Sequence, residues 1–104
     1  MRKVRFTVEA AEELEQAAAW YEEECPGLGA RFVDATESAL TLLKEDFPPL
    51  APAYGEAGKR GVKQILLHTF PFSLIVLPDG DVMVIVAVAH HHRKPLYWSD
   101  RINT

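Results

Sequence analysis

The feature that most constrains the fold is a turn sequence, Pro78-Asp79-Gly80-Asp81, with an apolar run on each side of it. Glycine in such a turn supplies the positive φ that closes a tight hairpin, and the flanking runs, 72–77 and 82–90, are rich in β-branched residues. A third run of this kind covers 62–68. The second half of the chain is therefore predicted to form three strands of a mainly antiparallel sheet.

The last of these strands is apolar at nearly every position. In a regular strand the side chains alternate between two faces. One face would then hold Val82, Val84, Val86 and Val88, and the other Met83, Ile85, Ala87 and Ala89. Apolar residues on both faces are typical of a central strand that is covered on both sides, or of one whose second face a partner covers.

Two helices are predicted before these strands. A short alternating strand over 3–7 leads to Thr7, which can cap a helix over 8–24. A second helix is expected over 28–46, and the short link between the two makes them an antiparallel hairpin. The segment 47–61, dense in proline and glycine, is predicted to be a loop between helix and sheet.

The first predicted helix is amphipathic. Its apolar stripe consists of Leu14, Ala17, Ala18 and Tyr21, at positions i, i+3, i+4 and i+7. Its other faces are expected to carry Glu12, Glu13, Glu15, Glu22, Glu23 and Glu24. The last three of these oppose the helix dipole, which is a small cost in stability.

These elements define the predicted architecture. Residues 1–104 form one domain of the α+β class, since the chain has the length of a common single domain. The element order is β-α-α-β-β-β, with the helical hairpin packed on a mainly antiparallel four-stranded sheet.

Composition limits the classes of function. The formal net charge is −4, and it is uneven: residues 1–58 carry a balance of −7, whereas residues 59–104 carry +3 and all four histidines. A globally acidic protein is a poor general nucleic-acid binder, although a local basic patch can still bind phosphate. No apolar run reaches the roughly 18 residues needed to cross a membrane, and the single cysteine, Cys25, fits a reducing compartment. The expected location is the cytoplasm, with no cofactor.

The candidate functional residues lie in the basic tail that follows the last strand. They are His90, His92, Arg93, Lys94, Tyr97 and Trp98. Such a set could bind a phosphodiester and transfer protons, or it could form a protein-binding epitope, because Arg, Tyr and Trp dominate interface hot spots. Alternatively, the two aromatic rings close the core while the polar side chains bind carbonyl groups at the strand end.

The histidine run, His90-His91-His92, suggests a metal site only weakly. In an extended segment the first and third side chains share one face and the second points away. Two histidines at this spacing need a third ligand, which the sequence does not supply at a typical spacing. No metal is therefore expected.

The order of motifs resembles the RelE/ParE superfamily, whose members are toxins of bacterial toxin–antitoxin and plasmid-stabilisation modules. The matching motifs cover nearly the whole chain. They are F-T-x-E-A from Phe6, W-Y at Trp20, P-G-L-G-x-x-F from Pro26, F-P-F at Phe70, the D-G-D turn at Asp79, and H-x-x-R-x-P-x-Y-W from His90 to Trp98. The combination is closest to the ParE-like branch, and it implies the same β-α-α-β-β-β topology.

The resemblance implies one of two targets. ParE-like members inhibit DNA gyrase and are not nucleases, whereas RelE-like members cut mRNA at the ribosome with a cluster of cations on the sheet. Gln64, Leu66 and Ser73 stand where that cluster is expected, so the nuclease pattern is incomplete and gyrase inhibition is the favoured function. For a metal-independent RNase, the residues that could stand in are Lys63, His90, His92, Arg93 and Tyr97. A third alternative is a non-toxic orphan binding module.

The resemblance also implies a cognate antitoxin, with which the chain could form a toxin–antitoxin hetero-oligomer. The expected contacts are Trp20, Tyr21 and Phe32 on the helical hairpin. A basic antitoxin would suit the acidic first part of the chain. Among the tail residues, His90, His92, Arg93, Lys94, Tyr97 and Trp98 are expected to contact the target.

Overall fold

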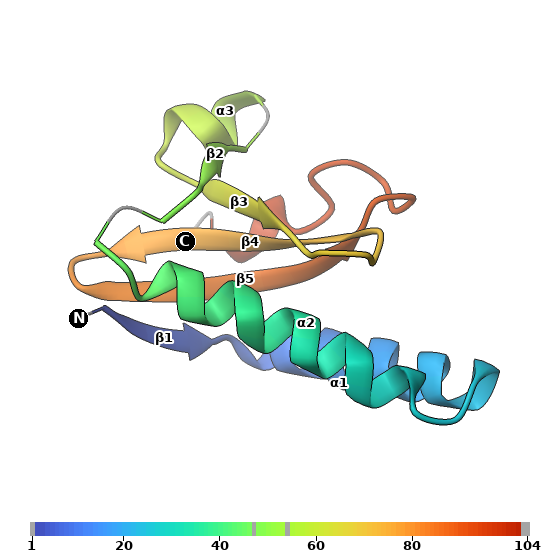
Figure 1. The fold of residues 1–104 in the computed structure, drawn as a ribbon. Helices are drawn as coiled ribbons and strands as arrows, with labels where there is room; N and C mark the ends of the chain where they lie inside the picture. Colours follow the sequence, from blue (N-terminus) through green and yellow to red (C-terminus); the bar gives the residue numbers. More distant parts are fainter. Residues whose placement is uncertain (1, 47, 54, 103–104) are drawn as a thin grey trace.

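The computed structural model describes residues 2–46, 48–53 and 55–102, and it shows a sheet with a helical hairpin on one face (Figure 1). The hairpin consists of α1 (Val8–Glu24) and α2 (Leu28–Leu43), and short helical segments α3 (Gly55–Lys59) and η1 (Ser99–Arg101) follow later in the chain. The strands are β1 (Lys3–Phe6), β2 (Ala51–Pro52), β3 (Lys63–Leu66), β4 (Phe72–Asp79) and β5 (Val82–His90). Their order in the sheet is β1-β5-β4-β3-β2. In the described part of the chain, no helix is long and apolar enough to span a membrane.

The α+β class and the helical hairpin are as predicted, but the four-stranded sheet is not. The fifth strand is β2, which lies inside the segment predicted to be a loop and pairs with β3 at Gln64 and Lys63. A strand of two residues is too short to show alternation, and its Pro52 is tolerated because β2 is an edge strand. The first strand, β1, pairs in parallel with β5, whereas all other neighbours are antiparallel.

The first helix begins and ends where the sequence predicts. Thr7 caps it, since the Thr7 Oγ1 accepts a hydrogen bond of 3.1 Å from the Ala10 N–H. Glu22, however, does not simply oppose the dipole of α1 as predicted. Its carboxylate accepts hydrogen bonds from the N–H groups of Gly27 and Gly29, so it caps the N-terminus of α2 instead.

The second helix ends at Leu43, three residues before the predicted end at Asp46. Lys44 and Glu45 donate their N–H groups to the carbonyls of Thr41 and Leu42, and these i→i−3 bonds close the helix in a tight last turn. Near its start, a Cβ on Gly29 would lie 2.6 Å from the Ala18 carbonyl oxygen, so this glycine lets the two helices approach closely.

The last strand, β5, does not alternate regularly. Its register with β4 pairs Ile75 with Ala87 and Val76 with Ile85, which leaves Val86 opposite no residue. This β-bulge inverts the alternation, so that Val88 shares the helix-covered face with Ile85, contrary to the predicted faces. The expectation of a central strand covered on both sides is confirmed, because every residue from Met83 to Ala89 is buried.

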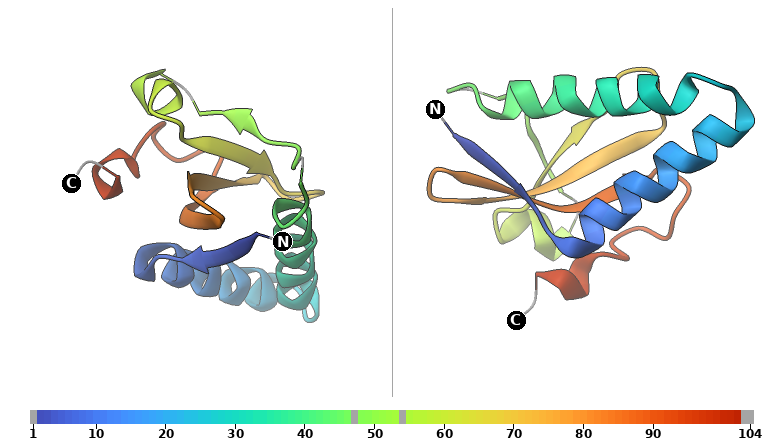
Figure 2. Two further views of the ribbon diagram at one scale, coloured as in Figure 1. Left: turned by 90° about the vertical axis from the view of Figure 1, so that its left-hand side faces the viewer. Right: turned by 90° about the horizontal axis from the view of Figure 1, so that it is seen from below.

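The second face of the sheet is covered by the end of the chain. Residues 91–102, called the C-terminal segment below, cross this face and bring Trp98 into a core with Ile75, Val84 and Ala89. Val62 and Ala57 of the α3 region complete that core. The two views in Figure 2 show the helical hairpin and the C-terminal segment on different sides of the sheet.

Candidate functional site

The site is built at an open part of the β5 edge. β1 pairs with β5 only as far as Ile85, and the Thr7 N–H makes the last bond to this edge, 3.0 Å from the Ile85 carbonyl oxygen. Beyond it, side chains bind the backbone of the bulged strand. The Val88 N–H donates to Glu13 Oε1 at 3.0 Å, and Arg101 Nη1 donates to the Val86 carbonyl oxygen at 2.9 Å. The open edge is thereby closed by α1 and the C-terminal segment.

Glu13 makes most of the hydrogen bonds that close this edge. Its Oε1 accepts Arg101 Nη1 at 2.9 Å, and its Oε2 accepts Arg101 Nη2 at 3.1 Å and the Tyr97 hydroxyl at 2.6 Å. Only 12% of the Glu13 side chain and 20% of the Arg101 side chain are exposed. A bidentate guanidinium–carboxylate pair in this setting is stronger than a surface ion pair. Glu13, Tyr97, Arg101 and Arg93 are called the Glu13 cluster below.

The cluster fixes the charge states of its members. Burial raises the pKa of Glu13, but hydrogen bonds from Arg101, Tyr97 and the Val88 N–H, with the Arg101 charge, outweigh it and leave the pKa below its usual value. Burial, then the hydrogen bond to Glu13 and its charge, raises the pKa of Tyr97. The Tyr97 phenol therefore stays protonated at neutral pH and donates to Glu13.

Arg93 is the outermost member of the cluster. Its guanidinium carbon lies 3.8 Å from the centre of the Tyr97 ring, and its Nη1 lies 3.6 Å from Glu13 Oε2. Even so, 53% of the side chain is exposed. Arg93 is thus a cation that is held by an aromatic ring and a carboxylate but is still accessible to a partner.

The three histidines diverge at the end of β5, as their alternation predicts. The His92 N–H donates to His90 Nδ1 at 3.0 Å, and these two rings lie 5.0 Å apart. His91 turns the other way, where its Nε2 lies 2.9 Å from the Ser73 Oγ. Burial, followed by the charges of His92 and His91, lowers the pKa of His90, so that this ring is neutral at neutral pH.

His90 lines a small cleft together with residues of α1. The cleft has a volume of about 270 Å³, and it is lined by Ala17, Trp20, Tyr21, Phe72 and His90. Trp20 is 57% exposed and stacks edge-on against Tyr21. Phe32, by contrast, is fully buried behind Tyr21, so any role in binding an antitoxin is to support that ring. The cleft brings Trp20, from the first helix, next to His90, from the last strand.

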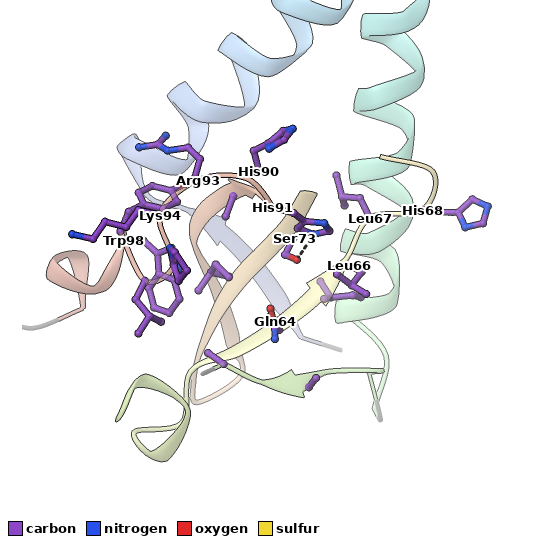
Figure 3. Close-up of a pocket in the computed structure, with 18 of the residues that line it drawn as sticks. Gln64, Leu66, Leu67, His68, Ser73, His90, His91, Arg93, Lys94 and Trp98 are labelled. Carbon is purple, nitrogen blue, oxygen red and sulfur yellow. Dashed lines mark hydrogen bonds between the residues drawn. The ribbon is translucent and has the colours of Figure 1, made fainter. Parts of the chain in front are cut away.

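A larger groove, of about 900 Å³, lies on the opposite face of the sheet (Figure 3). Its lining is mainly apolar and includes Leu66, Ile75, Ala89, Leu96 and Trp98. The Ser73–His91 pair and Gln64 are polar groups of this lining. Arg93 and Lys94 also belong to this lining, although in Figure 3 the charged ends of their side chains point outward from it.

The residues proposed for RNA cleavage come together only in part. His90, Arg93 and Tyr97 line the groove, and the His92 ring contacts His90, but Lys63 is not among the described residues that line either the groove or the cleft. The Tyr97 phenol and Arg93 are also bound by Glu13, which leaves a negative charge beside both groups. Trp98 is 4% exposed and belongs to the core, as the alternative reading of the tail proposed. In the part of the chain that the structure describes, no group of three His, Cys, Asp or Glu side chains could hold a metal ion.

Two important residues were missed or misplaced by the sequence analysis: Glu13 and Arg101. Glu13 was assigned to an exposed helix face, but it follows the buried Ala10 by three residues and precedes Ala17 by four, which places it on the apolar stripe. A carboxylate at such a position signals a buried partner. Arg101, four residues after Tyr97, carried no comparable signal, because its position depends on how the C-terminal segment crosses the sheet.

Comparisons with known proteins agree with this fold. A family model described as the ParE toxin of type II toxin-antitoxin system, parDE, matches residues 4–95. A solved structure titled "Chromosomal ParDE TA system from P. aeruginosa" is similar to the chain, with a TM-score of 0.71 and 21% sequence identity. The alignment covers 86% of this chain and 96% of that one. No curated protein sequence matches the chain.

Proposed function

Because this chain belongs to the family of ParE toxins of type II toxin–antitoxin systems, we propose that it inhibits DNA gyrase by binding it and that a cognate antitoxin neutralises it. The binding of Arg93 and of the Tyr97 hydroxyl by the Glu13 carboxylate, with Lys63 outside the described lining of the groove, supports inhibition by binding rather than RNA cleavage. Catalysis of phosphodiester cleavage needs donors and cations aimed at one reacting phosphate. A binding surface needs only exposed side chains held in a fixed arrangement.

The proposed gyrase-binding surface is the accessible part of the basic tail. His92, Arg93 and Lys94 are exposed at the turn that follows β5. Tyr97 and Trp98 support this turn from behind, since the first stacks under Arg93 and the second is anchored in the core. His90 reaches the same surface through its contact with the His92 ring.

We expect the purified protein to inhibit supercoiling by DNA gyrase and to leave mRNA intact. Replacing Arg93 and Lys94 together with alanine should raise the concentration needed for inhibition at least about tenfold, because arginines of this kind are frequent binding hot spots. The measurement is a supercoiling assay with relaxed plasmid, run in parallel with translated mRNA in a cell-free reaction. Arg31→Ala, an exposed cation on α2, is the matched control and should inhibit like the wild type.

Two outcomes would contradict the proposal. Cleavage of translated mRNA with unchanged supercoiling would show that the protein is a nuclease and not a gyrase inhibitor. Strong expression in bacteria without growth arrest, DNA damage or filamentation would identify a non-toxic binding module.

The antitoxin is proposed to cover the cleft beside α1. Trp20 combines a large apolar ring with 57% exposure at the rim of the cleft, and tryptophan is enriched among the residues that dominate binding energy at interfaces. We expect Trp20→Ala to weaken antitoxin binding at least about tenfold, a typical loss for a hot-spot tryptophan. Calorimetric titration of the antitoxin into the toxin measures this effect.

Val8→Ala is the matched control for this substitution. Val8 is 72% exposed on the same helix but lies at its other end, so its removal should change the affinity little. A hydrogen-exchange footprint of the antitoxin that leaves the end of α1 unprotected would contradict the proposed location.

A further inference from the structure

Arg93 differs from the other exposed cations of the C-terminal segment because the Tyr97 ring and the Glu13 carboxylate restrict its side chain. A free arginine loses up to about 2 kcal/mol of side-chain conformational entropy when a partner fixes it. In this structure the Tyr97 ring, 3.8 Å below the guanidinium, and Glu13 Oε2, 3.6 Å away, already restrict the side chain. An arginine fixed before binding is a better hot spot than a mobile one.

The Tyr97 ring, on which Arg93 stacks, is itself held in place by Glu13. The Tyr97 hydroxyl donates to Glu13 Oε2 at 2.6 Å. Arg101, which lies on the same C-terminal segment as Tyr97, donates hydrogen bonds to both carboxylate oxygens of Glu13. Glu13 also accepts a hydrogen bond from the Val88 N–H, two residues before His90, the last residue of β5. The Glu13 carboxylate on α1 therefore contacts the end of β5, the Tyr97 hydroxyl and the Arg93 guanidinium at once.

We propose that Glu13 is a positioning residue for the gyrase-binding surface, which acts by holding Tyr97 and thereby fixing the guanidinium of Arg93. The inference rests on the proposed function, because it requires that Arg93 contact gyrase. Glu13 itself does not reach the proposed gyrase-binding surface. Only 12% of the Glu13 side chain is exposed, and its carboxylate is bound by Tyr97, Arg101 and the Val88 N–H, so Glu13 acts through Arg93 and the C-terminal segment.

The preferred test is a double-mutant cycle with Glu13→Gln and Arg93→Ala in the supercoiling assay. Glutamine keeps the size of the side chain but removes its charge and replaces one acceptor oxygen by a donor, so it cannot keep all four hydrogen bonds that Glu13 accepts from Tyr97, Arg101 and Val88. If Glu13 acts through Arg93, each single variant inhibits at least about tenfold less well, and the double variant is no weaker than Arg93→Ala alone. Losses that multiply in the double variant would overturn the proposal. Glu12→Gln, on an exposed neighbouring position, should leave inhibition unchanged.

A second measurement does not depend on the target. NMR relaxation of the Arg93 Nε–H group, recorded well below the unfolding temperature, reports the mobility of the guanidinium directly. We expect Glu13→Gln to increase this mobility, whereas a variant with an equal loss of stability in the helix-covered core, such as Leu43→Ala, should not. An Arg93 that is as rigid in Glu13→Gln as in the wild type would overturn the proposal. A protein that shows the increase but does not inhibit gyrase would refute the proposed function and leave the positioning role intact.

Discussion

Replacing Glu13 with alanine is expected to lower the free energy of unfolding by about 3 kcal/mol, because the substitution removes the only carboxylate of a partly buried cluster. Arg101, which is 20% exposed, keeps its bond to the Val86 carbonyl but loses its charge partner. The Val88 N–H and the Tyr97 hydroxyl lose acceptors at the same time. Urea denaturation of the two proteins at neutral pH measures the difference.

The same cluster predicts how stability depends on pH. The pKa of Glu13 in the folded protein lies below its ordinary value of 4.5, so the folded state binds the proton less readily than the unfolded state. The contribution of Glu13 is therefore complete above that value and is lost as the pH falls through the lower pKa of the folded state. The stability difference between wild type and Glu13→Ala should shrink on acidification in this range. Glu12→Ala, one residue away and exposed, is the control and should stay within about 0.5 kcal/mol at all pH values.

A difference that is constant from neutral pH to strongly acidic pH would contradict the argument. It would mean that Glu13 contributes through packing of its methylene groups rather than through its charge.

The helical hairpin was predictable because local chemistry determines it. Thr7 caps α1, and Pro26 with Gly27 ends the helical run, so the predicted bounds of 8–24 agree with the structure. These signals act within a few residues of sequence, where capping and backbone preference dominate. The same holds for the β4–β5 hairpin, whose turn has Gly80 at φ 61°.

The bulge and β2 were not predictable, because both depend on pairing between distant segments. Val86 is apolar like its neighbours, so the alternation contains no sign that one residue lacks a partner in β4. β2 forms only where Ala51 and Pro52 meet β3. In both cases the register of the sheet, rather than local propensity, decides the structure.

The proposed binding surface was predictable only in part. Arg93 lies after the end of β5 and is exposed, as the sequence predicts, but the sequence could not say which of the following rings would turn inward. Tyr97 and Trp98 are adjacent, and the structure gives them different roles: one carries Arg93 and the other enters the core. The missing information is the path of the C-terminal segment, which Arg101 fixes through Glu13, 88 residues earlier.

The shortness of β1 connects these observations. Because β1 ends at Phe6, which pairs with Ile85, the β5 edge is open from Val86 onward, and an open edge exposes unpaired backbone groups. Closing the edge with Glu13 and Arg101 requires the C-terminal segment to fold back over the sheet. The same path presents Arg93 and Lys94 at the surface. The path of the C-terminal segment that closes the β5 edge thus also places Arg93 and Lys94 at the surface.

Trp98→Ala is expected to lower the free energy of unfolding by about 4 kcal/mol, the typical loss when a buried tryptophan is truncated. Trp98 is 4% exposed and packs on the second face of the sheet, where the C-terminal segment covers Ile75, Val84 and Ala89. For a domain of this size, such a loss corresponds to a fall in Tm of roughly 16 °C or more. Thermal unfolding followed by circular dichroism measures it, and Trp20→Ala, at a ring that is 57% exposed, is the matched control with a much smaller effect.

The Trp98 prediction separates anchoring from direct contact with the target. If Trp98 anchors the C-terminal segment, Trp98→Phe should recover most of the stability and most of the proposed inhibition of gyrase, because a phenyl ring fills much of the same space. If the indole instead contacted gyrase, Trp98→Phe would be stable but would inhibit poorly. Fluorescence of the Trp20→Phe protein, whose remaining tryptophan is Trp98, decides the point independently. An anchoring residue remains shielded from an added quencher until the protein unfolds, whereas quenching in the folded state would show that the C-terminal segment lifts from the sheet.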